Sequence, residues 1–89
     1  MFHPEVTTLR FDRHIFNGQG TGLKLIPKEE SVDVLFYYAG NVIVGRITDE
    51  LWVYTYEAYE RHGFMPIEFD YKGTNFCGWV ESKKIELVP

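Results

Sequence analysis

Cysteine is nearly absent from the chain: Cys77 is the only one among 89 residues. No disulfide can therefore form within the chain, and a zinc site built mainly from cysteines is excluded. Small secreted domains commonly rely on disulfides, so a single cysteine favours a reducing compartment. The first residues also lack the basic and apolar regions of a signal peptide. We expect a cytoplasmic protein, or an extracellular one if a leader has been removed.

Long apolar runs and clustered cations are also missing. No apolar stretch approaches the roughly 18 residues that a membrane-spanning helix needs. Nine Lys and Arg stand against 13 Asp and Glu, for a net charge of −4, and the longest basic run is the pair Lys83-Lys84. Binding to nucleic acid or to an anionic membrane requires clustered cations, so we expect neither partner. The acidic balance instead suits a partner that carries Lys or Arg.

Apolar and aromatic residues, in contrast, are plentiful. The chain is 45% hydrophobic and contains 7 Phe, 6 Tyr and 2 Trp. These residues can bury a core large enough for one small domain. We expect residues 1–89 to form that single domain, with residues 1–6 as a loose N-terminal arm.

β-Branched and aromatic residues predict strands along most of the chain. Gly45, inside one of these segments, predicts a bulge or a barrel corner. The glycine-rich run at 17–22 predicts an ordinary loop, because the Lys-Ser/Thr pair and the following helix of a phosphate-binding loop are missing. The expected strands cover residues 6–11, 23–27, 32–38, 42–48, 51–54, 67–71, 76–80 and 85–88.

One segment breaks the strand pattern and predicts a short helix over residues 55–62. Thr55 can cap the start of this helix, and Glu57 lies in the first turn, where the helix dipole favours an acid. Gly63 suits the position just after the last turn. So short a helix is marginal alone, so we expect it to pack against the rest of the domain.

The clearest pattern lies in the C-terminal third. Residues 67–71 alternate apolar and polar side chains, which is the period of a half-buried strand. Lys72–Asn75 predicts a turn in which Gly73 takes a positive φ. A returning strand, a single local turn at 81–84 and a short last strand complete the segment.

This order of elements resembles the end of the bacterial SH3 domain (SH3b) over residues 66–88. The resemblance implies an all-β fold, a small SH3-like barrel of five or six antiparallel strands, here with one short helix inserted near residues 55–62. It also implies a non-catalytic binding module, since the ligand in that family is often a cell-wall peptide or a partner protein. The matching residues are Gly73, Gly78-Trp79-Val80, Ser82-Lys83, Ile85 and Leu87.

The sequence contains no motif for catalysis or metal binding. Cys77 lies in an apolar strand, which predicts a buried and inert thiol. His3, His14 and His62 lack the spacing of metal ligands. The carboxylates of the strand at 67–71 predict only a solvated strand face. We therefore expect neither an enzyme nor a bound cofactor or metal, and a small enzyme using Cys77 is a less favoured alternative.

The supply of tyrosine and tryptophan exceeds what one small core holds. Both side chains are amphipathic and favour interfaces. We expect some of them, with neighbouring Asp or Glu, to line a groove for a peptide, a glycan stem or a cationic ligand. The expected function is protein or peptide binding by an adaptor or complex subunit. The expected ligand-binding residues are Tyr37, Tyr38, Trp52, Tyr54, Tyr56 and Trp79.

Three alternatives to this function stay open. The chain could be a peptidoglycan-binding domain of a larger secreted enzyme, which the same resemblance allows. The aromatic residues could form a Tudor-like cage for a methylated cation. A flat aromatic strand could also pair with a second copy of the chain and give a homodimer.

Overall fold

The computed structural model describes residues 2–5 and 20–89. The strand expected at 6–11, residue His14 and the start of the glycine-rich loop lie outside these ranges. The all-β prediction is confirmed for the described residues, which form strands and two single 3₁₀ turns, η2 and η3. The elements are β1 (Phe2–Pro4), β2 (Thr21–Pro27), β3 (Val32–Leu35), β4 (Ile43–Ile47), β5 (Leu51–Thr55), η2 (Glu57–Tyr59), β6 (Phe64–Tyr71), β7 (Thr74–Glu81), η3 (Ser82–Lys84) and β8 (Ile85–Val88).

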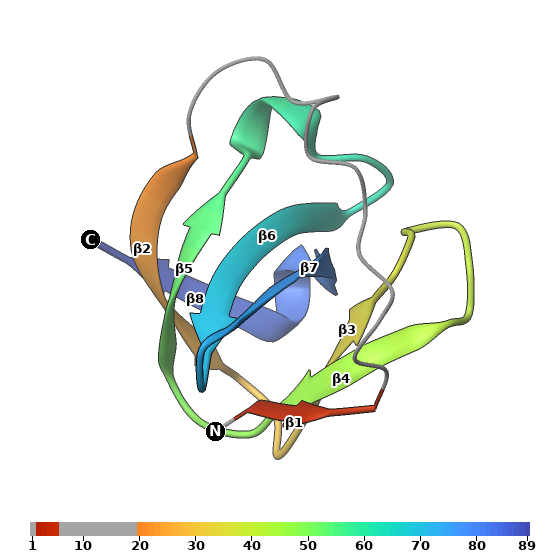
Figure 1. The fold of residues 1–89 in the computed structure, drawn as a ribbon. Helices are drawn as coiled ribbons and strands as arrows, with labels where there is room; N and C mark the ends of the chain where they lie inside the picture. The colour runs from red at the N-terminus through yellow and green to blue at the C-terminus, as the bar shows by residue number, and fades with distance from the viewer. Residues whose placement is uncertain (1, 6–19) are drawn as a thin grey trace.

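The strands form one antiparallel sheet in the order β1-β4-β3-β7-β6-β5-β2-β8. The sheet is open, with β1 and β8 at its edges, and it curls so that its strands surround a common interior (Figure 1). The sheet has eight strands rather than the five or six that we expected. Seven of them match segments that the sequence predicts as strands, and β1 is the additional one. None of the helical turns in the described ranges has the length or apolarity to cross a membrane.

The core lies inside the curl, and alternation along each strand selects its residues. On β6, Ile67 and Phe69 are buried, while Asp70 on the other face is exposed. On β7, Phe76 lies opposite Phe69 and Val80 lies opposite Met65, and both β7 residues are also buried. Together they form a single hydrophobic cluster with Phe2, Leu25, Val32, Val34, Val44, Ile47, Val53, Met65 and Ile85.

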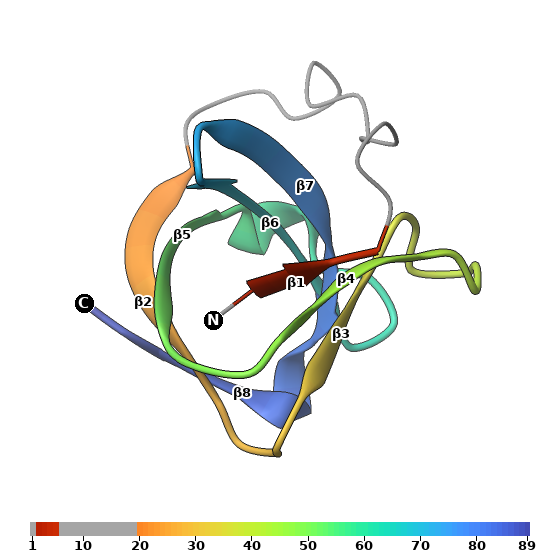
Figure 2. The ribbon, with the colours of Figure 1, turned by 60° about the horizontal axis from the view of Figure 1, so that its bottom comes forward.

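The N-terminal residues are not the loose arm that we expected. Phe2 is 1% exposed and pairs with Ile47 of β4, and its ring centroid lies 4.8 Å from those of Phe69 and Phe76. Gly45 allows this packing, because a Cβ atom there would lie 2.3 Å from the Phe2 ring. Figure 2 shows β1 beside β4, with which it pairs at the edge of the sheet. The prediction was wrong because it overlooked a large apolar residue whose partners lie far along the chain.

The bulge predicted near Gly45 is present. Val34 pairs with Gly45, but the next β3 residue, Leu35, pairs with Ile43, so the register shifts by one residue. This leaves Val44 as the extra residue of β4. Such a shift bends a strand and increases its twist, which helps the sheet to curl.

The helix predicted over 55–62 reduces to the single turn η2. Thr55 belongs to β5, where it pairs with Thr21 and Ile67, so it cannot cap a helix. Its side chain is buried, and its hydroxyl donates to the Thr21 carbonyl at 3.3 Å. Strand pairing across the sheet therefore overrides the local helix pattern. Gly63 does adopt a positive φ of 80°, but in a turn that leads into β6.

The C-terminal prediction is largely confirmed. The β6–β7 hairpin turns through two residues, Lys72 and Gly73, with φ of 51° and 81°, as tight hairpin turns require. The turn is shorter than the Lys72–Asn75 segment that we expected, so Asn75 lies within β7 and pairs with Asp70. The single turn η3 and the last strand β8 are found where the sequence predicts them.

Glu81 joins η3 to its surroundings through ion pairs. Its carboxylate lies 3.1 Å from Lys83 Nζ and 3.6 Å from Lys84 Nζ, and Lys84 also lies 3.9 Å from Glu29 after β2. The hydrogen bond from Lys83, with the positive charge of both lysines, lowers the pKa of Glu81 below its ordinary value of 4.5. The network therefore favours the ionised form of Glu81 in the fold.

Truncating Phe2 tests the packing of β1. We expect Phe2→Ala to lower the free energy of unfolding by about 3–5 kcal/mol, the usual cost of removing a buried aromatic ring. Pro4→Ala, at the exposed end of the same strand, is the matched control and should change it by about 1 kcal/mol or less. Urea denaturation measures both variants, and equal effects would contradict a buried Phe2.

Acid titration tests the Glu81 network. Because the folded pKa of Glu81 is lowered, its contribution to stability is present above pH 4.5 and is lost as the pH falls through the folded pKa. We expect Glu81→Gln to be less stable than the native chain at pH 6 and the difference to shrink towards pH 3. Urea midpoints across this range measure it. A difference that stays constant with pH would show that Glu81 does not contribute in this way.

Candidate aromatic binding surfaces

The structure distributes the six predicted binding aromatics over two parts of the sheet. Tyr37, Tyr38 and Trp79 meet beside the β3–β4 hairpin and β7. Trp52 and Tyr54 lie on β5, which the intervening strand β6 separates from β7. The sequence did not predict that these aromatic residues form two separate groups.

The first group, the ring cluster, consists of Tyr37, Tyr38, His62 and Trp79. Tyr38 stacks on the His62 ring at a centroid distance of 5.4 Å and meets Trp79 edge-on at 4.9 Å. Tyr37 lies 4.5 Å from Tyr38 and 6.2 Å from Trp79. The rings come from the turn after β3, the turn before β6 and strand β7, so the fold alone brings them together.

Exposure differs strongly within the ring cluster. Trp79 is only 4% exposed, so it forms the floor, whereas Tyr38 is half-buried and Tyr37 is 48% exposed. Val42, near the end of the same hairpin, is 41% exposed. A partner would therefore contact mainly Tyr37, Val42 and the edges of Tyr38 and His62, while Trp79 supports them from below.

Tyr37 and Tyr38 are also coupled through their hydroxyl groups. A hydrogen bond with the Tyr38 hydroxyl, together with partial loss of solvent, raises the pKa of Tyr37 above its ordinary value of 10.0. The ring of Tyr37 also packs against Tyr38 and Trp79, which limits its freedom.

The second group, the β5 face, consists of Trp52, Tyr54, Gly22 and Asp70. Trp52 and Tyr54 are 62% and 55% exposed. They are two residues apart on β5 and therefore point to the same side of the sheet. A hollow of about 360 Å³ lies beside them and is lined by Gly22, Trp52, Val53, Tyr54, Phe69 and Asp70.

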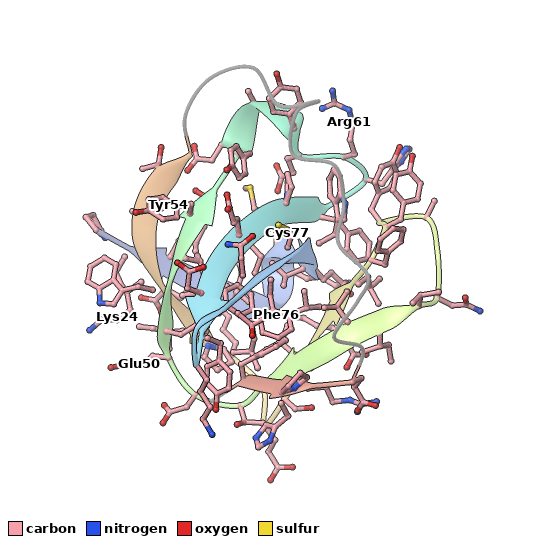
Figure 3. The ribbon with its side chains drawn as sticks, viewed as in Figure 1. Lys24, Glu50, Tyr54, Arg61, Phe76 and Cys77 are labelled. Carbon is pink, nitrogen blue, oxygen red and sulfur yellow. The ribbon has the colours of Figure 1, made fainter. Side chains whose placement is uncertain are left out.

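Neighbouring strands complete the β5 face. Tyr54 pairs with Gly22, and a Cβ atom at Gly22 would lie 3.6 Å from the Tyr54 ring, so the ring extends over the bare backbone of β2. Trp52 pairs with Lys24, whose ammonium lies 3.6 Å from Glu50. Figure 3 shows Tyr54, Lys24 and Glu50 on the same side of the molecule.

A polar network lies next to the β5 face. Asn75 Nδ2 donates to Glu68 Oε2 and to Asp70 Oδ1, both at 3.0 Å, and the Tyr56 hydroxyl donates to Glu68 Oε1 at 2.7 Å. Glu68 is only 8% exposed, so the prediction of a fully solvated carboxylate face was wrong for this residue. Tyr56 is one of the residues that we expected to contact a ligand, and its hydroxyl donates a hydrogen bond that positions Glu68.

Cys77, His3 and His62, the described residues that could take part in catalysis or metal binding, lie in different surroundings. Cys77 is buried, as the sequence predicts, with its Sγ 3.6 Å from Asn75 Oδ1. His3 Nε2 lies 3.1 Å from Thr48 Oγ1, far along the chain from His62 in the ring cluster. Within residues 2–5 and 20–89, no three His, Cys, Asp or Glu residues are grouped to hold a metal ion.

Sequence analysis missed His62 as part of the ring cluster. We expected this segment to be helical, but His62 takes a φ of 53° in the turn before β6. No local pattern could indicate its stacking partner, because Tyr38 belongs to another hairpin. Only the curl of the sheet brings β7 and the two turns together.

No protein-family model, curated protein or solved structure matches this chain. The functional argument therefore depends on the geometry of its own residues.

Replacing Tyr38 tests the coupling in the ring cluster. In Tyr38→Phe the hydroxyl that raises the pKa of Tyr37 is missing, so we expect this pKa to fall towards 10. The measurement is an NMR titration of tyrosine labelled with ¹³C at Cζ. Tyr54→Phe, on the other aromatic surface, is the control and should leave Tyr37 unchanged. An unaltered Tyr37 titration in Tyr38→Phe would disprove the coupling.

Proposed function

We propose that this chain is a non-catalytic binding module with an SH3-like barrel architecture, which binds a protein or peptide partner through the ring cluster. The observation that carries the proposal is the position of Tyr37. Its ring is 48% exposed, yet it packs against Tyr38 and the buried Trp79. An exposed aromatic ring on a rigid aromatic floor is typical of the residues that dominate binding energy at interfaces.

The order and pairing of the last elements support the SH3-like architecture. The β6–β7 hairpin is followed by the single 3₁₀ turn η3 and by the short strand β8. β8 then pairs with β2, the first long strand of the described chain, over Lys24–Pro27. The chain thus returns to its own beginning after the hairpin, as a small barrel of this class does.

The chemistry of the ring cluster supports binding rather than catalysis. Tyrosine and tryptophan offer large contact areas and lose little side-chain freedom on binding, because packed rings are already ordered. His62 adds a polar ring at the edge, through its stacking on Tyr38. Such a surface suits apolar or aromatic side chains of a partner, framed by hydrogen bonds, and the chain would serve as an adaptor or complex subunit.

Peptide selection tests this function. We expect a phage-displayed library of random 12-residue peptides to yield a consensus sequence that binds the native chain. Tyr37→Ala should weaken binding of the selected peptide at least tenfold, as expected for a central aromatic contact. Calorimetry or fluorescence polarisation provides the affinities.

Tyr54→Ala is the matched control, because Tyr54 is similarly exposed but lies on β5. It should leave the affinity for the selected peptide unchanged. Selection without any consensus, or equal losses for both variants, would argue against the ring cluster as the peptide site. Retention on purified peptidoglycan that requires Tyr37 would instead favour the cell-wall alternative.

A further inference from the structure

We propose that the β5 face is a second binding site, separate from the ring cluster, and that it takes the guanidinium group of an arginine side chain from a partner protein or peptide. The site lies in the hollow of about 360 Å³ between Trp52, Tyr54 and Asp70. It goes beyond the proposed function, because neither the ring cluster nor its partner is needed for it.

The spacing of the two aromatic residues carries the first step. Two positions along a strand correspond to about 6.6 Å, and side chains on the same face stand roughly perpendicular to the sheet. Figure 2 shows β5 bending around the interior of the sheet, so side chains on its outer face diverge. The hollow that Trp52 and Tyr54 line is therefore wide enough for one flat group beside the two rings, since carbon atoms pack at about 3.5–4 Å.

The charge of the site carries the second step. Asp70 is exposed at the edge of the hollow, and Asn75 occupies only one of the roughly four acceptor positions of its carboxylate. Glu68 lies beside it in the same polar network. The aromatic faces of Trp52 and Tyr54 also attract cations. Lys24 is the cation on the strand position next to Trp52, and its ammonium forms an ion pair with the Glu50 carboxylate at 3.6 Å, which offsets its charge.

The shape of the site distinguishes arginine from lysine. A guanidinium group is planar, stacks on aromatic rings and presents paired N–H donors that match a carboxylate. An ammonium group is compact and strongly hydrated, so it gains less binding energy from contact with two aromatic rings. Gly22 adds to the fit, because it leaves the backbone of β2 bare next to the Tyr54 ring. The hollow, the two rings and the Asp70 carboxylate together favour arginine.

NMR titration of the full ¹⁵N-labelled chain tests this site. The probes are three capped tripeptides, acetyl-Gly-X-Gly-amide, in which X is arginine, lysine or citrulline, the neutral and nearly isosteric analogue of arginine. We expect the arginine peptide to shift the Trp52 indole N–H signal in a saturable way. The citrulline peptide should bind at least tenfold more weakly, and the lysine peptide at least threefold more weakly.

Variants locate the binding. The backbone amide signals of β5 report binding in all variants. We expect Trp52→Ala to abolish it and Asp70→Asn to weaken it at least fivefold, while Tyr37→Ala should leave it unchanged. The side chains of Trp52 and Asp70 are exposed, so these variants should fold, which the dispersion of the amide spectrum will verify. Selected peptides that bind the ring cluster are not used, so the result is independent of the proposed function.

Several outcomes would overturn the proposal. We expect a Kd for the arginine peptide of about 1 mM, as for a single side-chain contact. Three results would each reject an arginine site: equal affinity for the citrulline or lysine peptide, full affinity in Asp70→Asn, or no shift of the Trp52 indole signal at a peptide concentration of about 20 times that Kd. Sedimentation velocity adds a further arm. A native dimer that Trp52→Ala converts to monomer would show that the β5 face binds a second copy of this chain instead.

Discussion

The structure depends on the register between β6 and β7. Eight consecutive pairs, from Phe64 opposite Glu81 to Tyr71 opposite Thr74, align the two strands. Because side chains alternate between faces, this one register sends Ile67 and Phe76 into the core and directs Glu68 and Cys77 to the opposite face of the sheet. Both aromatic surfaces are built against that outer side. Core packing and binding geometry thus follow from the same set of backbone hydrogen bonds.

The parts that the sequence predicted are those governed by neighbours along the chain. The strand over 67–71, the positive φ of Gly73 and the short turn before β8 are all local, and the structure confirms them. The helix at 55–62 was wrong because the pairing of Thr55 with distant strands outweighs its local preference. Phe2 was misjudged for the same reason.

The two aromatic surfaces also combine features that depend on residue type with features that depend on distant strands. That some tyrosine and tryptophan side chains stay exposed was predictable from their number and amphipathic nature, but that Tyr37, Trp52 and Tyr54 are exposed and Trp79 is buried was not. Their grouping was also not predictable, because it depends on which strands become neighbours and on turns that only the folded sheet positions. The β5 face required a strand pair with Gly22, whose lack of a side chain has meaning only opposite Tyr54.

The connection around η2 touches both surfaces. Its first residue, Tyr56, is held by Glu68 in the polar network beside the β5 face, and His62 at its other end stacks on Tyr38. This short segment is therefore clamped at two points by unrelated contacts. The fixed path of this segment therefore sets the position of Tyr56 beside one aromatic surface and of His62 within the other.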